Sequence, residues 1–172
     1  MALGLFLGAA LITYALTSFF TKEDFFLTPQ KKPIFEIKVS GGDQPGFIGP
    51  GDSFSTSPTV YNNATEEMYV FIKVEMPVVS DGGLYEFVVG DGWVKVEDGV
   101  YAYGEDEMTT LAPGETTNPL TSEMKMREIS RAEYSTLENI SIKITGYAIG
   151  TEDVPVVPSE AWEVCKSIGN IE

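Results

Sequence analysis

Short runs in which apolar and polar side chains alternate recur along this chain. In the clearest run, residues 68–76, the side chains of Val70, Ile72 and Val74 fall on one side of the alternation, and Pro77 ends it. A repeat of two residues is typical of a β-strand, because successive side chains point to opposite faces. Further strands are expected at residues 34–39, 58–62, 84–89, 93–96, 100–103 and 139–149.

Glycine, proline and aspartate separate these runs and predict the turns between strands. Asp98-Gly99 lies between two valines and is a strong hairpin signal. Residues 111–117 predict a turn that leads into another strand, and residues 123–135 predict a strand followed by an exposed loop. We therefore expect an all-β domain, folded as an antiparallel β-sandwich of jelly-roll or immunoglobulin-like type.

The last part of the chain changes character. In the last predicted strand, Ile140, Ile142 and Ile144 are expected to point inward. After it, a short C-terminal helix is expected, with Ser159 as the capping residue and Gly169 as the residue that ends it.

Residues 1–20 contain no charged side chain. Three interpretations of this apolar segment stay open. It can be a signal peptide cleaved after Ala15, since Thr13 and Ala15 are suitably small, although no Lys or Arg precedes the run. It can be a retained helix in the core of a filament, or a membrane anchor of barely sufficient length. Each interpretation places the following domain outside the cytoplasm, with membrane contact through residues 1–20 at least during export.

We divide the chain into three parts. Residues 1–27 form the apolar N-terminal segment, residues 28–33 form a linker, and residues 34–172 form the β-domain. The formal net charge is −15, from 26 acidic and 11 basic residues. Such a charge repels polyanions and keeps an exposed protein soluble, so no nucleic-acid partner is expected.

Little in the sequence points to catalysis. The chain has no histidine, which excludes Ser–His and Cys–His nucleophile pairs and a histidine-liganded zinc. It also lacks the common phosphate-binding and hydrolase motifs. Cys165 is the single cysteine, so no intrachain disulfide can form, and we expect a small buried apolar residue. We expect no enzymatic activity and no cofactor.

Two kinds of surface residue are candidate sites. Glu105, Asp106 and Glu107 lie together in a loop, and loop carboxylates can bind calcium, but their spacing does not match an EF-hand loop. Asn63 and Asn139 each begin a glycosylation sequon. Because turn carboxylates usually serve the backbone, we predict no metal site and keep the three acidic residues only as calcium candidates.

Several short motifs occur in an order that spans nearly the whole chain. They are Pro58-Thr59-Val60-Tyr61-Asn62, residues 69–77, Trp93, residues 111–117, Tyr147-Ala148-Ile149 and Ala161-Trp162. In this order and spacing the chain resembles the TasA/camelysin family of secreted biofilm-fibre subunits, which includes relatives similar to archaeal bundling pili. The start of the chain is similar as well, with a small-residue apolar run followed by Phe19-Phe20 and an acidic pair.

The resemblance implies a jelly-roll-like sandwich that is secreted to form fibres. In such fibres the N-terminal segment of one subunit can complete the sheet of the next. The donor in this chain would be residues 16–27, with Phe19, Phe20, Phe25 and Phe26 as anchors. On the residues alone, these phenylalanines could equally cover the core of their own subunit. The protease activity described for camelysin is not carried over, because this chain has no histidine.

The function expected from these observations is structural. The chain would be the subunit of an extracellular filament, pilus or biofilm-matrix fibre that polymerises head to tail with itself through its N-terminal segment. Donor-strand exchange and a buried helical core are both open as the mechanism. The alternative is a membrane-anchored cell-surface module for adhesion or ligand binding.

Overall fold

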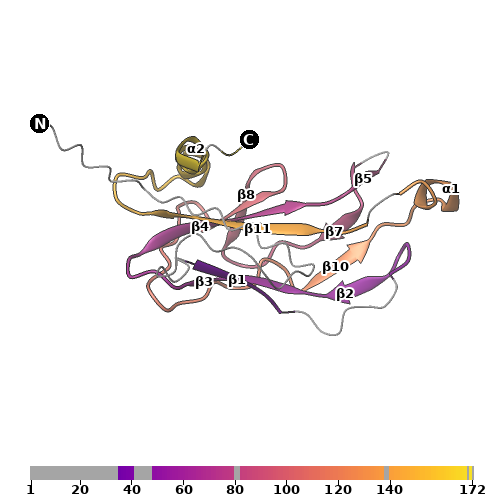
Figure 1. The fold of residues 1–172 in the computed structure, drawn as a ribbon, viewed down its shortest axis with the longest axis horizontal. Helices are drawn as coiled ribbons and strands as arrows, with labels where there is room; N and C mark the ends of the chain where they lie inside the picture. The colour runs from indigo at the N-terminus through magenta and orange to yellow at the C-terminus, as the bar shows by residue number, and fades with distance from the viewer. Residues whose placement is uncertain (1–34, 41–47, 80–81, 138–139, 170, 172) are drawn as a thin grey trace, which may run out of the picture.

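The computed structural model describes residues 35–40, 48–79, 82–137, 140–169 and 171 (Figure 1). The strands are β1 (Phe35–Ser40), β2 (Ser53–Ser55), β3 (Ser57–Asn62), β4 (Met68–Glu75), β5 (Val78–Val79), β6 (Gly82–Gly83), β7 (Tyr85–Phe87), β8 (Trp93–Glu97), β9 (Val100–Tyr103), β10 (Glu123–Met126) and β11 (Lys143–Gly150). The helices are α1 (Arg131–Tyr134) and α2 (Pro158–Gly169). Every pairing among the described strands is antiparallel, which confirms the prediction of an all-β chain with antiparallel sheets.

The first sheet has the strand order β11-β4-β9-β8. The predicted hairpin at Asp98-Gly99 is confirmed, since it joins the antiparallel strands β8 and β9. Gly99 has a φ of 71°, and the pairing shifts between Lys95 and Glu97. A positive φ is easily reached only by glycine, and the shift in register is a β-bulge, so this turn bends the end of β8.

The second sheet contains β1, β3, β2, β10 and β7, in two pieces that backbone hydrogen bonds connect. Thr117 N donates to Val60 O at 2.9 Å, and Leu120 N donates to Pro58 O at 2.8 Å. Residues 116–122 therefore run beside β3. The prediction of a strand after residue 117 is wrong. Only isolated hydrogen bonds and a single bridge connect this segment to β3, and Pro119 has no N–H to donate to a ladder.

Two apolar clusters pack against opposite faces of the first sheet. On one face, Val70 of β4 packs in a cluster with Val60 of β3 and Met124 of β10, so both sheets contribute to one core. On the other face, Phe71 of β4 packs in a cluster with Trp162 of α2. Figure 1 shows α2 on the side of β4 and β11 that lies away from β1 and β2. The first sheet is therefore the middle layer, which explains why most of β4 is buried on both faces.

The start of β11 differs from its prediction. The strand begins at Lys143 rather than at residue 139, although Ile144 points into the core as expected and is 4% exposed. The register pairs Lys143 with Glu75, so a strand that started at residue 139 would have to continue the pairing past Met76 and through Pro77. Proline cannot donate to a ladder, and this ends the pairing. Ile142 is half-buried and packs against the core from outside the strand.

Helix α2 confirms the predicted C-terminal helix, but its first residue is Pro158. Ala161 N donates to Val157 O at 2.9 Å, so Val157 occupies the capping position and the prediction of Ser159 as cap is wrong. Proline suits the first helical position because its missing N–H is not needed there. In residues 123–135 the predicted strand is β10, and the expected loop contains the single turn α1, whose Ser130 cap accepts a hydrogen bond from Glu133 N at 3.1 Å.

Candidate assembly surfaces

The outer edge of β11 is a candidate surface for adding a strand. On one side β11 pairs in register with all eight residues of β4. On the other side no strand of the described part of the chain pairs with it. Between Lys143 and Gly150 the strand carries no charge, and every residue is buried. A long, regular edge without charges can template pairing with another chain.

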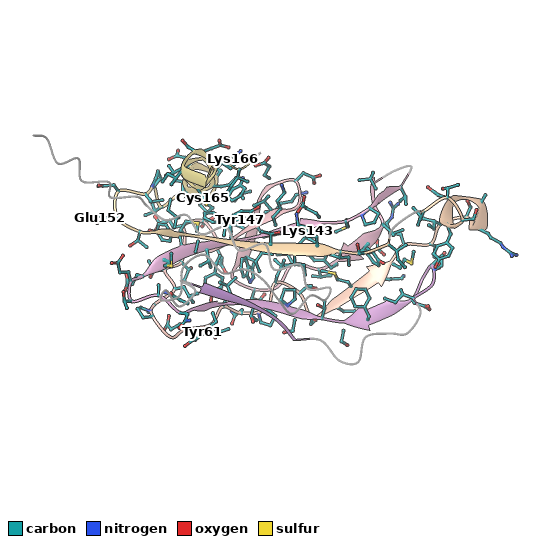
Figure 2. The ribbon with its side chains drawn as sticks, in the orientation of Figure 1. Tyr61, Lys143, Tyr147, Glu152, Cys165 and Lys166 are labelled. Carbon is teal, nitrogen blue, oxygen red and sulfur yellow. The ribbon has the colours of Figure 1, made fainter. Side chains whose placement is uncertain are left out.

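Side chains on both faces of β11 hold its edge in one orientation. Ile144 and Ala148 belong to the core between the sheets, whereas Tyr147 and Ile149 belong to the cluster under α2. The rings of Tyr147 and Trp162 lie 5.4 Å apart, close to an edge-on arrangement. Figure 2 shows Tyr147 on the part of β11 near Cys165 of α2. Burial raises the pKa of Tyr147, with smaller contributions from Glu75 and Cys165.

Thr145 sits in the middle of β11 with an unsatisfied hydroxyl. Its side chain is 2% exposed, and its Oγ1 has no hydrogen-bond partner in the part of the chain that the structure describes. Buried hydroxyls in native proteins nearly always have a partner. A water molecule or a residue outside the described part of the chain can supply that partner.

The outer edge of β8 at the other side of the first sheet has opposite properties. β8 has five residues, contains the bulge, and exposes Lys95 and Glu97. The Lys95 ammonium lies 2.9 Å from Asp98 Oδ1. Charged side chains and bulges on an edge strand both oppose pairing with another strand. This edge is therefore unsuited to strand addition.

Helix α2 is tied to β8 through Glu97. Trp162 Nε1 donates to Glu97 Oε2 at 2.5 Å, and Lys166 Nζ donates to the same oxygen at 3.0 Å. The hydrogen bond from Trp162, followed by that from Lys166, lowers the pKa of the Glu97 carboxyl. Lys166 also pairs with Glu163 at 2.8 Å, and its hydrogen bonds to Glu163 and Glu97 raise the pKa of its ammonium. Two side chains of α2, Trp162 and Lys166, thus bind the Glu97 carboxylate of β8 and hold the helix against the sheet.

The predicted assembly and processing residues lie outside the described part of the chain. They are Ala15, Phe19, Phe20, Phe25, Phe26 and Asn139. The proposed segment boundaries at residues 27 and 33 lie outside it as well. Their roles stay predictions.

The calcium candidates Glu105, Asp106 and Glu107 are all exposed in one tight turn. Glu105 N donates to Glu107 O at 3.1 Å, and Gly104, with a φ of 154°, forms a bridge to Met108. A Cβ at residue 104 would collide with the carbonyl oxygen of Glu107, so this turn requires glycine. Among the described residues, no three acidic, cysteine or histidine side chains form a group that could hold a metal ion, and these three do not come together as one.

The sequon residue Asn63 lies half-buried in the loop between β3 and β4, and its neighbour Asn62 has a structural role that the sequence did not indicate. Asn62 is fully buried. Its Nδ2 donates to Leu111 O at 2.7 Å and to Glu66 O at 2.9 Å, and its Oδ1 accepts from Ala64 N at 2.8 Å. The hydrogen bond from Ala64 N to Asn62 Oδ1 forms an Asx turn. The position of an asparagine at the end of a predicted strand is the only sequence signal for this role.

Some exposed apolar side chains were also missed at the level of sequence. They are Val78, Val88, Val156, Val157 and Ile168. Val78 and Val88 are the most exposed, at 77% and 84%. Valine runs predict buried strands, so the pattern alone could not separate these residues from the core.

Comparison with known proteins does not identify a relative. No protein-family model, no curated protein and no solved structure matches the chain. Within the described residues, no helix has the length and apolarity needed to cross a membrane. The function is therefore argued from the surfaces themselves.

Proposed function

We propose that this chain is the structural subunit of an extracellular filament, either a pilus or a fibre of a biofilm matrix. In this proposal the protein is secreted and polymerises head to tail through its N-terminal segment. Its two sheets form an antiparallel sandwich of the jelly-roll type, as the resemblance to the TasA/camelysin family implies. The observation that carries the proposal is the outer edge of β11, with which no strand of the described residues pairs.

An incoming strand would gain a complete ladder on this edge. β11 offers eight residues in regular register, and no charged side chain interrupts residues 144–149. Main-chain hydrogen bonds supply affinity in strand addition, and side-chain pockets supply specificity. A strand beside β11 would also lie next to the orphaned Oγ1 of Thr145. The β8 edge has the bulge and charges that oppose such addition, so growth would use one edge only.

The two Phe-Phe pairs of residues 16–27 suit this edge, whereas Thr21, Lys22, Glu23 and Asp24 between them are polar. In a strand, Phe19 and Phe25 would point to one face, and Phe20 and Phe26 to the other, because their numbers differ in parity. β11 itself is buried on both faces, so a strand beside it would need apolar side chains on both faces too. An amphipathic strand, apolar on one face only, would not meet this requirement.

The proposal is tested by removing the donor and supplying it separately. The full chain should form filaments that are visible by negative-stain electron microscopy. Deletion of residues 1–27 should leave a soluble monomer, with folding verified by circular dichroism and thermal unfolding. A synthetic peptide of residues 16–27 should then bind that monomer and slow hydrogen exchange of the β11 amides, but not of the β8 amides.

The matched control is the same peptide with its four phenylalanines replaced by alanine, which should bind much more weakly. Normal polymerisation of the deletion variant would refute the N-terminal mechanism. If the full chain forms filaments and the peptide leaves β11 unprotected, residues 1–20 act as a helical filament core instead. A full chain that stays monomeric in detergent would favour the membrane-anchored adhesion module.

A further inference from the structure

The β5–β6 hairpin presents one exposed apolar side chain. Val78 is 77% exposed, whereas the next residue, Val79, is 7% exposed and packs in a core cluster. The alternation of a strand explains this contrast, since neighbouring side chains point in opposite directions. The Val78 side chain is therefore available at the surface of the hairpin.

Positive charge lies beside this hairpin. Arg127 Nη1 donates to Gly83 O at 3.4 Å, and Gly83 pairs with Val78. Arg131, the first residue of α1, is exposed. Figure 1 shows β5 and α1 at the same end of the long axis, which we call the hairpin end. Among its described residues, Arg127 and Arg131 are outweighed by Asp52, Glu128 and Glu133, which gives this end a formal charge of −1.

The opposite end of the domain is strongly acidic. It consists of the loops 63–67, 104–116 and 151–157. Two contacts bring these loops together: Gly150 pairs with Met68, and Met108 N donates a hydrogen bond of 2.7 Å to Val156 O. None of the three loops contains Lys or Arg. Their acidic residues are all exposed and are Glu66, Glu67, Glu105, Asp106, Glu107, Glu115, Glu152 and Asp153. Figure 2 shows Glu152 at this acidic end.

The acidic end also exposes apolar side chains and is where the chain enters β1. Val156 and Val157 are 46% and 41% exposed beside the acidic loops. Phe35, the first residue of β1, pairs with Asn62 at this end. Residues 1–34 therefore join the domain at the acidic end. β11, by contrast, starts at Lys143, opposite Glu75, on the half of the sheet toward the hairpin end.

We propose that the acidic end of one subunit docks on the hairpin end of the next, with Val156 and Val157 against Val78 and the carboxylates against Arg131. This contact rests on the proposed function, since it takes the occupant to be a second copy of this chain. Two acidic ends repel each other, so the contact is directional and generates an open chain rather than a closed dimer.

The same contact would deliver the N-terminal segment to the neighbour. A linker of residues 28–33 spans about 20 Å when extended. From the acidic end of its own subunit, it can carry residues 16–27 to the start of β11 in the next subunit. The docking of the two ends and the addition of a strand to β11 are thus compatible with one arrangement of neighbouring subunits. In that arrangement, the end-to-end contact fixes the register of the added strand along β11.

The test reverses one charge in the full chain. Arg131→Glu should raise the critical concentration for filament formation about tenfold, because it places a carboxylate opposite the acidic end. Val78→Ser should raise it as well, by loss of the apolar contact. Lys95→Glu makes the same charge change on the exposed β8 edge, away from both ends, and should leave it unchanged. Arg131→Glu combined with Asp106→Lys should recover part of the loss.

Each result decides something different. If the parent forms filaments and Arg131→Glu and Val78→Ser form them equally well, the end-to-end contact is wrong while the proposed function stands. If Lys95→Glu is as damaging as Arg131→Glu, net charge rather than the hairpin end controls assembly, and the contact is again wrong. If the parent forms no filaments at all, the proposed function fails, and the contact fails with it.

Discussion

The two outer strands of the first sheet, β11 and β8, differ in almost every property that governs pairing. β11 is eight residues long, regular and uncharged between its ends. β8 has five residues, a bulge, and a carboxylate held by α2. A sheet with two open edges would grow in both directions and aggregate, whereas one blocked edge limits growth to the other. Of the two outer strands, only β11 therefore has an edge suited to pairing with another strand.

The largest effect is expected where α2 holds the sheet. Trp162 is 2% exposed, packs against Phe71 at a ring distance of 5.2 Å, and donates to Glu97. Trp162→Ala should lower the free energy of unfolding by about 3–5 kcal/mol, because it removes a buried indole and leaves a cavity. Chemical denaturation monitored by circular dichroism measures this change.

Ser167→Ala, at an exposed position on the same helix, is the control and should change stability by less than about 0.5 kcal/mol. If Trp162→Ala were as mild as this control, α2 would not be part of the cooperative fold, and the protection of β8 by the helix would have to be abandoned.

An intermediate effect is expected at the turn that bends β8. Gly99 has a φ of 71°, and a Cβ there would lie 2.6 Å from Val74 O. Gly114 has a similar φ of 81°, but a Cβ there would meet nothing within 4 Å. Gly114→Ala should therefore cost about 1–2 kcal/mol of backbone strain alone. Gly99→Ala should cost more, by an amount that reports the collision, as measured by denaturant titration of the two variants side by side.

Equal losses for the two alanine variants would contradict this reading of the turn. Movement of β8 or β4 would then relieve the collision between the alanine Cβ and Val74 O, and the turn would be easier to deform than the backbone geometry indicates.

The smallest effect concerns the charge on Glu97. Its folded pKa lies below the ordinary value of 4.5, so the carboxylate stabilises the fold above that value and the stabilisation is lost as pH falls through the folded pKa. Because the side chain is half exposed, the contribution is about 1 kcal/mol or less. Glu97→Gln should cost this amount at pH 7, and the difference from the parent should vanish in acid, where the parent carboxylate is protonated.

Glu86→Gln removes an exposed carboxyl from β7 and provides the background for general acid effects. Thermal unfolding of the parent and both variants from pH 7 downward gives the comparison. A Glu97→Gln deficit that persisted in acid would show that the glutamine disturbs the packing of Trp162 rather than removing a charge.

The repeating patterns of the sequence predicted most of the strands. β4 and β1 stand out by alternation alone, and Asp98-Gly99 predicted the hairpin because glycine reaches a positive φ most easily. The start of β11 was misplaced, since its limit is set by Pro77, which follows the end of β4 and lies far away in the sequence. The cap of α2 was misplaced by two residues, because Pro158 can begin a helix without a polar cap.

Very little of the candidate surfaces could be predicted from the sequence. The openness of the β11 edge depends on the strand order, which no local pattern encodes. The link from Glu97 to Trp162 joins residues 65 positions apart. The same holds for the acidic end, where three separate loops meet, and for Asn62, whose amide reaches Leu111. The exposed Val78 could not be recognised either, since a buried and an exposed valine look alike until the hairpin is known.

The single cysteine gives this protein an internal reporter. Cys165, a residue of α2, is fully buried between the helix and the sheet, and burial raises the pKa of its thiol to about 12. A thiol reagent can react with it only after the helix has lifted from the sheet and the thiolate can form in water. The labelling rate therefore measures how often the helix opens, and no cysteine has to be introduced for this measurement.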